Sequence, residues 1–338
     1  MLLRLWLNSC RRLAVPGVLA VLWMVAPTGC SRSARPSMAC DPKAMYATIE
    51  TLCSDSLAGR RAGSGNDLRA ARFLASELNT VGCVPLWRKA LVPFSIDGAV
   101  VRRGMERVLA GEWRDSSYNV VMTIRSRYPD AEKVLLGAHY DHLGRFKADK
   151  GGRYSAGDQL LGANDNASGT AAVVEIARRL QPYADDFRRD LVVALFGAEE
   201  MGLAGSRHLE RMLRDSSVTI GHMVNLEMFG RMRGDTLCLQ GEILSPVSRV
   251  VECVGNPDSL RIELSARGSA GSSDHVAFAS QMIPVSFFIT TDISTLHTVD
   301  DTPESLDMEG MERAVNYIMR YVYTLLTSDQ LPKLQENS

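Results

Sequence analysis

The sequence predicts an α/β fold, a three-layer αβα sandwich around a central, mostly parallel mixed β-sheet. Short apolar runs of the buried-strand type alternate with amphipathic helical segments along the chain. This alternation is typical of sheets that are covered by helices on both faces. Acidic residues and histidines follow several of the apolar runs directly. In such sheets ligands bind in the loops beyond the carboxyl ends of the strands, so this placement supports the same fold.

Each element of the sandwich has its own signal in the sequence. Two amphipathic segments open the domain, and in the second of them Ala70, Leu74 and Leu78 recur at helical spacing. Strands are expected at residues 119–124, 134–138, 190–196, 222–226 and 285–289, where short runs of apolar residues occur. Helices are expected at residues 42–54, 65–81, 167–180, 203–213 and 308–326.

The first residues of the chain are typical of an export signal. Arginines precede an apolar run at 13–26, which is short for a membrane anchor and suits a secretory signal. The run ends before a Gly-Cys pair, which resembles the cleavage site of a bacterial lipoprotein. We expect a signal peptide at 1–29, a lipid anchor on Cys30, a tether at 30–41 and one domain at 42–338. The protein would then be exported and held at the membrane, facing the periplasm or the cell surface; an ordinary signal peptide is the alternative.

The charge balance and the cysteines argue against two kinds of function. The chain has 38 basic and 39 acidic residues, so it lacks the basic surface that binding to nucleic acid requires. No Cys-x-x-Cys pair is present, which argues against a thiolate zinc site. Cysteines beyond the leader are compatible with disulfides, for example between Cys238 and Cys253, or with single buried thiols.

Two motifs combine histidine and aspartate near predicted strand ends. Gly-Ala-His-Tyr-Asp-His contains His139 and Asp141, which lie on the same side of an extended backbone. A carboxylate in this place can orient a ligating imidazole. Gly-Ala-Asn-Asp-Asn-Ala-Ser-Gly contains Asp165, our candidate to bridge two metal ions, although its Asn and Ser residues also suit a helix cap. The role of His142 remains open.

Three further segments supply carboxylates and a second histidine. Glu199 and Glu200 follow a buried strand, and adjacent carboxylates repel each other there unless a cation neutralises them. We assign Glu200 as a metal ligand and Glu199 as a general base. Glu227 ends another apolar run, and His297 lies in a loop before the last helix. Two histidines and three carboxylates suit a pair of zinc ions that share one carboxylate, with a free glutamate to activate water for attack on an amide.

Together the ordered motifs resemble the double-zinc aminopeptidases of the bacterial leucyl-aminopeptidase type, a family related to glutamate carboxypeptidases and glutaminyl cyclases. The similarity runs from about residue 45 to 326. It implies a zinc-exopeptidase fold for the domain, a peptide substrate and two zinc ions as cofactors. It also implies one zinc site formed by His139, Asp165 and Glu227, a second formed by Asp165, Glu200 and His297, Glu199 as the base and Asp141 as the residue behind a ligand.

The resemblance therefore predicts a metallo-aminopeptidase that removes N-terminal residues from peptides. Glu227 stands where the aminopeptidases usually have aspartate. Together with Arg267, it keeps a carboxypeptidase or dipeptidase open as an alternative. A single-zinc glutaminyl cyclase on the same scaffold is a further alternative. The sequence does not predict the oligomeric state.

Overall fold

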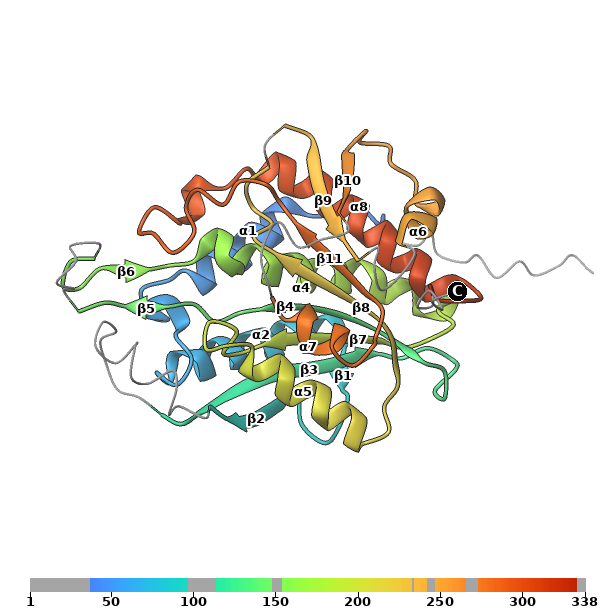
Figure 1. Ribbon diagram of the computed structural model, residues 1–338, viewed down its shortest axis with the longest axis horizontal. Coiled ribbons are helices and arrows are strands. Elements are labelled where there is room, and N and C mark those ends of the chain that lie inside the picture. Colours follow the sequence, from blue (N-terminus) through green and yellow to red (C-terminus); the bar gives the residue numbers. More distant parts are fainter. Residues whose placement is uncertain are drawn as a thin grey trace, which may run out of the picture. The chain divides into compact units, whose positions relative to one another are not determined.

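A mixed β-sheet forms the centre of the protein (Figure 1). The computed structural model describes residues 37–96, 114–147, 154–232, 234–241, 247–265 and 273–332. Within these residues the sheet has nine strands, with β2 (Leu91–Ser95) beside β3 at one edge. The strand order is β1 (Val84–Pro85), β3 (Ser116–Ile124), β7 (Leu191–Phe196), β4 (Lys133–His139), β8 (Ile220–Glu227), β11 (Val285–Ile289), β9 (Thr236–Gln240) and β10 (Arg261–Ser265).

The middle of the sheet is parallel, as the sequence predicted. β4 pairs in parallel with both β7 and β8, and β8 pairs in parallel with β11. The antiparallel partners β3 and β9 flank this core on either side. The carboxyl ends of β7, β4 and β8 therefore meet at one edge of the sheet, with the end of β4 in the middle.

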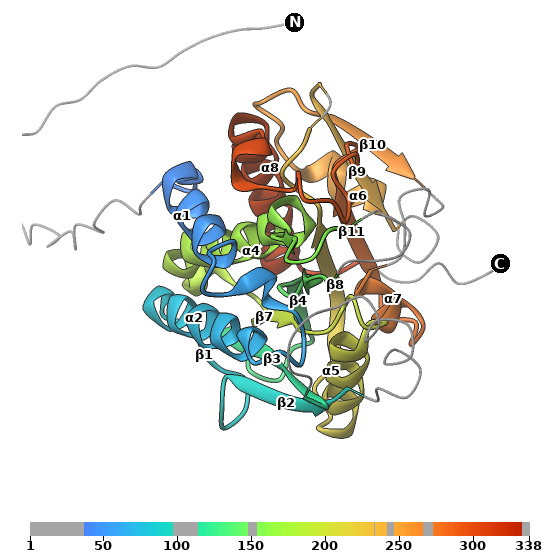
Figure 2. The ribbon, with the colours of Figure 1, turned by 90° about the vertical axis from the view of Figure 1, so that its left-hand side faces the viewer.

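Helices cover both faces of the sheet (Figure 2). Val134, Leu136 and Ala138 of β4 pack into the apolar cluster of one face, while Leu135 points into the cluster of the other. This alternation follows from the two-residue repeat of a strand. The first face is covered by α1 (Pro42–Leu52), α2 (Asn66–Val81), α4 (Gly169–Leu180) and α8 (Met308–Thr327), with α6 (Val247–Cys253) against α8. The second face is covered by α5 (Ala204–Asp215) and α7 (His275–Ala279).

Local chemistry explains where several helices begin and end. Asp41 caps α1, because its carboxylate accepts the amides of Lys43 and Ala44. α2 ends at Gly82, whose φ of +98° places it in the left-handed region that favours glycine. Shorter elements are β5 (Gly144–Arg145), β6 (Gln159–Leu160), η1 (Ala58–Arg60), η2 (Ala163–Ser168), η3 (Gln181–Asp186) and η4 (Pro303–Ser305).

The predicted fold class and all ten predicted helices and strands are confirmed, with shifts at their ends. The helix that we expected from residue 167 begins at Gly169, because 163–168 form a separate wide turn. The strands β1, β2, β9 and β10, towards the two sides of the sheet, and the short helices α6 and α7 were not predicted. The five described cysteines are all free, Cys238 and Cys253 among them.

The expected signal peptide at 1–29 and the anchor at Cys30 lie outside the described residues. Cys40 and Asp41, at the end of the expected tether, already contact the body of the domain through hydrogen bonds to Asn316 and Glu175. Among the described helices, none combines the length and the apolar character that crossing a membrane requires.

Candidate metal centre

The parallel core of the sheet brings polar side chains together at its carboxyl edge. His139 is the last residue of β4, and Glu227 is the last residue of β8. Glu199 and Glu200 follow β7 after two residues. Because β7 and β8 lie on either side of β4, the side chains that follow these three strands converge. The segment that bears Asp165 and the loop that bears His297 complete the centre.

The first ligand group consists of His139, Asp165 and Glu227. His139 Nε2 lies 3.0 Å from Glu227 Oε1 and 3.3 Å from Asp165 Oδ1. All three residues are buried. The second oxygen of Glu227 accepts a hydrogen bond of 2.6 Å from Ser273, and Thr170 donates to the His139 carbonyl at 2.8 Å. These bonds hold both ligands in place, as is usual around metal sites.

The second ligand group lies on the other side of Asp165. His297 Nε2 is 3.2 Å from Asp165 Oδ2 and 3.2 Å from Glu200 Oε2. Asp165 thus offers one carboxylate oxygen to each group. His142 faces the same two carboxylates, since its Nδ1 lies 2.9 Å from Glu200 Oε1 and 3.7 Å from Asp165 Oδ2. The ligand atoms of His142, Asp165 and Glu200 all lie within 4.8 Å of one another.

The spacing of the ligand atoms fits two tetrahedral zinc ions. With bonds of about 2.0–2.2 Å to nitrogen and oxygen, the ligand atoms of a tetrahedral zinc lie about 3.3–3.6 Å apart. The distances in the two groups run from 2.9 to 3.7 Å around this value. The residues present therefore fit a metal pair with Asp165 between the two ions.

The charge of the site also favours cations. Burial raises the pKa of Asp141 to about 8, and the negative charges of Glu200 and Asp274 add to this, although His139 opposes it. Burial likewise raises the pKa of Asp274 to about 7 and that of Glu199 well above its usual range. Each raised pKa means that the ionised carboxylate is destabilised at its buried position. A bound divalent cation would stabilise the ionised form.

The wide turn at 163–168 is held by side chains from distant segments. The carboxylate of Asp301 accepts the amides of Asn164 and Asp165, at 2.7 and 3.0 Å. Asp301 is fully buried, and no sequence motif indicates this contact. It fixes the backbone of the bridging residue directly.

The amide and hydroxyl groups of the same turn attach it to the end of β8. Asn166 does cap α4 through the amide of Gly169, one of the two capping residues considered from the sequence. Its side chain also accepts the amide of Met228 at 3.1 Å and donates to the Leu226 carbonyl at 2.9 Å. The polar residues of this motif therefore set the distance between Asp165 and Glu227.

Asp141 contacts both His139 and Glu199. His139 Nδ1 lies 3.2 Å from the backbone carbonyl of Asp141 and 3.8 Å from its carboxylate. The carboxylate instead accepts the amide of Glu199 at 3.0 Å. Asp141 thus orients His139 through its main chain and positions Glu199 through its side chain.

Arg60 was not identified from the sequence, which indicated only a basic, glycine-rich loop at 57–65. Its guanidinium is fully buried and donates to four backbone carbonyls. These are Tyr140 at 2.5 Å, Leu52 at 3.3 Å, Gly162 at 2.6 Å and Leu161. Among the described residues no carboxylate pairs with it. Arg60 therefore joins the backbone beside His139 to the backbone that leads into Asp165.

The remaining histidines have packing roles. His275 stacks on Phe287 with ring centres 4.1 Å apart, and burial lowers its pKa to about 4. His222 is buried, with Nε2 2.7 Å from Ser286 Oγ. His208 stacks on Phe94. Arg267 lies outside the described residues.

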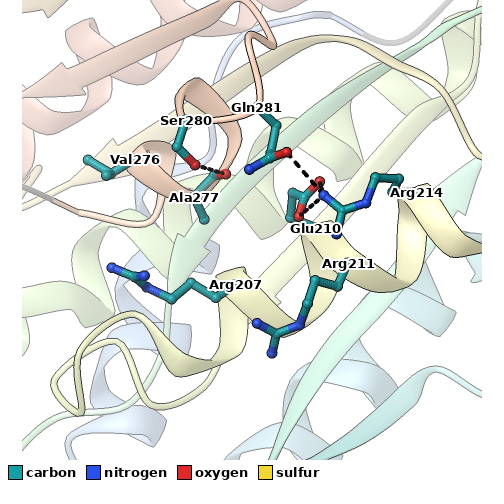
Figure 3. A pocket seen from close by; sticks show the side chains of 8 residues that line it. All are labelled: Arg207, Glu210, Arg211, Arg214, Val276, Ala277, Ser280 and Gln281. Carbon is teal, nitrogen blue, oxygen red and sulfur yellow. Dashed lines mark hydrogen bonds and ion pairs between the residues drawn. The ribbon is translucent and has the colours of Figure 1, made fainter.

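A surface pocket between α5 and α7 is separate from these ligand groups (Figure 3). It is lined by Arg207, Glu210, Arg211, Arg214, Val276, Ala277, Ser280 and Gln281. None of these residues belongs to either ligand group.

Comparison with known proteins identifies the family of the chain. The model of "Peptidase family M28" matches residues 119–322, a span that contains every ligand described above. The chain belongs to peptidase family M28. The resemblance inferred from the motifs is thereby confirmed.

Relatives and solved structures are similar to large parts of the chain. Aminopeptidase YwaD of Bacillus subtilis strain 168 is 32% identical over 225 residues, which cover 61% of this chain and 44% of that protein. The chain thus spans less than half the length of this relative. The structure of BSAP, a zinc aminopeptidase from Bacillus subtilis, has a TM-score of 0.65 at 17% identity and covers 87% of this chain and 97% of that one. A Bacteroides thetaiotaomicron glutaminyl cyclase has a TM-score of 0.63 at 17% identity, covering 88% of this chain and 100% of that one. At these identities the two structures establish the shared fold.

Proposed function

We propose that this protein is a zinc-dependent aminopeptidase that hydrolyses N-terminal residues from peptides. One observation supports this most directly: the two oxygens of Asp165 face different histidines, His139 and His297, at 3.3 and 3.2 Å. A carboxylate shared in this way suits two metal ions. The relatives named as aminopeptidases, among them YwaD, add support.

Two zinc ions would be held by the ligand groups on either side of Asp165, where they supply a water of lowered pKa and polarise the scissile carbonyl. Glu199 is the base that takes a proton from the attacking water and returns it to the leaving amine. Burial and the surrounding carboxylates raise the pKa of Glu199 well above its usual range, and this favours uptake of a proton. Glu199 is also partly exposed, so that a substrate can reach it.

A count of bound metal tests the two-metal site. The wild type is expected to bind two zinc ions per chain by elemental analysis after dialysis against zinc. Asp165→Asn should lose both ions, because it belongs to both groups, whereas Glu227→Ala should chiefly lose one. A wild type that holds a single zinc and does not respond to added metal would instead support the glutaminyl cyclase alternative.

The charge around the site supports the amino end of the peptide as the one that is bound. Six carboxylates surround the centre: Asp141, Asp165, Glu199, Glu200, Glu227 and Asp274. Among the described residues no arginine or lysine forms an ion pair with any of them. A free ammonium group can pair with such carboxylates, whereas a terminal carboxylate would need cationic or amide donors.

Two peptides of the same sequence, each blocked at a different terminus, distinguish an aminopeptidase from a carboxypeptidase. One has an acetylated N-terminus and the other an amidated C-terminus. The enzyme is expected to trim the amidated peptide from its free N-terminus and to leave the acetylated peptide intact. Loss of the C-terminal residue from the acetylated peptide would establish the carboxypeptidase alternative.

We also propose export and attachment to the membrane through a lipid on Cys30. The support is the arginine-containing start, the apolar run at 13–26 and the Gly-Cys pair that follows it. The protein would then act on peptides outside the cytoplasm.

A further inference from the structure

The second ligand group contains one residue more than the motif resemblance assigns to it. Besides Asp165, Glu200 and His297, the ring of His142 faces the same place. We propose that His142 Nδ1 is a fourth protein ligand of the second metal ion. The proposal rests on the two-metal function proposed above.

The distances fit coordination by this ring. His142 Nδ1 lies 2.9 Å from Glu200 Oε1 and 3.7 Å from Asp165 Oδ2, and the centres of the His142 and His297 rings are 5.8 Å apart. These values bracket the separation of about 3.3–3.6 Å between ligand atoms of a tetrahedral zinc. Neutral imidazole is a common zinc ligand through either nitrogen.

The orientation of the His142 ring is fixed by packing. The side chain is fully buried, and Gly162 lies directly against it. A Cβ at position 162 would be 2.4 Å from His142 Cγ, and the φ of Gly162 is +61°. Among the described residues no hydrogen-bond partner meets His142 Nε2, so the contact with Gly162 keeps Nδ1 directed at the centre.

The proposal makes the two metal positions unequal. The first group offers three protein ligands and leaves a fourth position open, as catalytic zinc sites do. With His142, four side chains would face the second position: His142, Asp165, Glu200 and His297. The second position would then hold its ion more firmly than the first and keep the bridging Asp165 in place.

A rival explanation is that His142 only donates a hydrogen bond to Glu200 and never touches the metal. The two explanations differ in the number of coordinated rings and in the nitrogen used. Protein labelled with ¹⁵N-histidine and loaded with ¹¹³Cd separates them, because only a coordinated nitrogen shows a scalar coupling to the metal. The chain has six histidines, so the spectrum is simple.

Three coupled rings are expected in the wild type, one of them through Nδ1. His142→Gln should remove the Nδ1-coupled signal and leave the Nε2-coupled signals of His139 and His297. If the wild type shows no Nδ1-coupled ring, the proposal is overturned. A protein that binds one metal with an Nδ1-coupled ring would refute the two-metal function while supporting His142 as a ligand.

Zinc affinity provides a second measurement. His142→Ala should weaken the tighter zinc equivalent by more than about a hundredfold in competition with a chelator, beyond the 10–100-fold typical for loss of a residue that merely orients a ligand. His208→Ala is the matched control, because this ring stacks on Phe94 outside the centre, and its affinity should equal that of the wild type. A loss of less than tenfold in His142→Ala would contradict coordination. Circular dichroism of the zinc-free variants establishes that they fold.

Discussion

Replacing Arg60 tests whether residues that do not contact the metal hold the candidate ligands in place. Arg60→Met keeps an unbranched apolar stem but removes the guanidinium and with it every donor. The four carbonyls that it binds belong to the end of α1, to the residue after His139 and to the two residues before the wide turn. We expect this variant to be less stable and to bind metal less tightly.

The expected loss in the free energy of unfolding depends on how many carbonyls would lose their only hydrogen-bond donor. The Gly162 carbonyl also accepts the amide of Ala167, and the Leu161 carbonyl lies 3.7 Å from the Cys53 thiol. The carbonyls of Leu52 and Tyr140 have no other donor among the described residues. A buried acceptor without a partner costs about 1–3 kcal/mol, so two of them cost about 2–6 kcal/mol. Because the residues that hold the ligand loops move, zinc affinity should fall by about 10–100-fold.

Urea unfolding of the zinc-free proteins measures the first effect, and competition with a chelator measures the second. Arg69→Met is the matched control, since Arg69 makes one exposed hydrogen bond to the Ser56 carbonyl. Its free energy of unfolding should stay within about 0.5 kcal/mol of the wild type. If Arg60→Met matched the wild type in both stability and zinc affinity, the supporting role described here would be refuted.

Other predictions concern the base, the pH dependence and the N-terminal anchor. Glu199→Gln should retain its metal and its fold but lose at least about a hundredfold in kcat, in line with general-base catalysis, and near-normal turnover would remove Glu199 from that role. Burial lowers the pKa of His222 to about 3, so below pH 6.5 the unfolded chain takes up a proton that the folded chain excludes. Stability should therefore fall by about 1.4 kcal/mol per pH unit between pH 6.5 and 3, and His222→Gln should lack this contribution when urea unfolding of the two proteins is compared; equal pH slopes would contradict it. Cys30→Ser should release the protein from the membrane fraction into the soluble exported fraction, whereas a wild type that is already in the soluble fraction would exclude the lipid anchor.

The central sheet, and the nearness of most residues of the candidate metal centre, could be predicted from the sequence because both are encoded locally. A buried parallel strand is a continuous apolar run, as at 134–138, and the candidate ligand His139 follows it directly. The edge strands lack this signal. β10, for example, consists only of exposed and half-buried residues and has no buried position. Its place in the sheet depends on pairing with β9, which no local pattern specifies.

The residues that support the centre could not be predicted from the sequence either, because their partners lie far away along the chain. Asp301 binds the backbone of Asp165 from a position 136 residues away, and Arg60 joins segments that are 101 and 102 residues further along the chain. All the hydrogen-bond acceptors of Arg60 are backbone carbonyls. Because every residue has a carbonyl, no sequence motif identifies these partners. The sequence does not assign a role to His142, because its neighbour Glu200 follows a different strand.

The order of the ligands along the chain has a consequence for the timing of assembly. His139, Asp165 and Glu227 have all been synthesised once β8 is complete, whereas His297 follows β11, the strand that pairs with β8. In the proposed two-metal site, a growing chain could therefore assemble the residues of the first position while the second still lacks His297. The second position would be complete only when the C-terminal part of the sheet has formed. Retention of both ions would then report that synthesis and folding have reached the last strand of the centre.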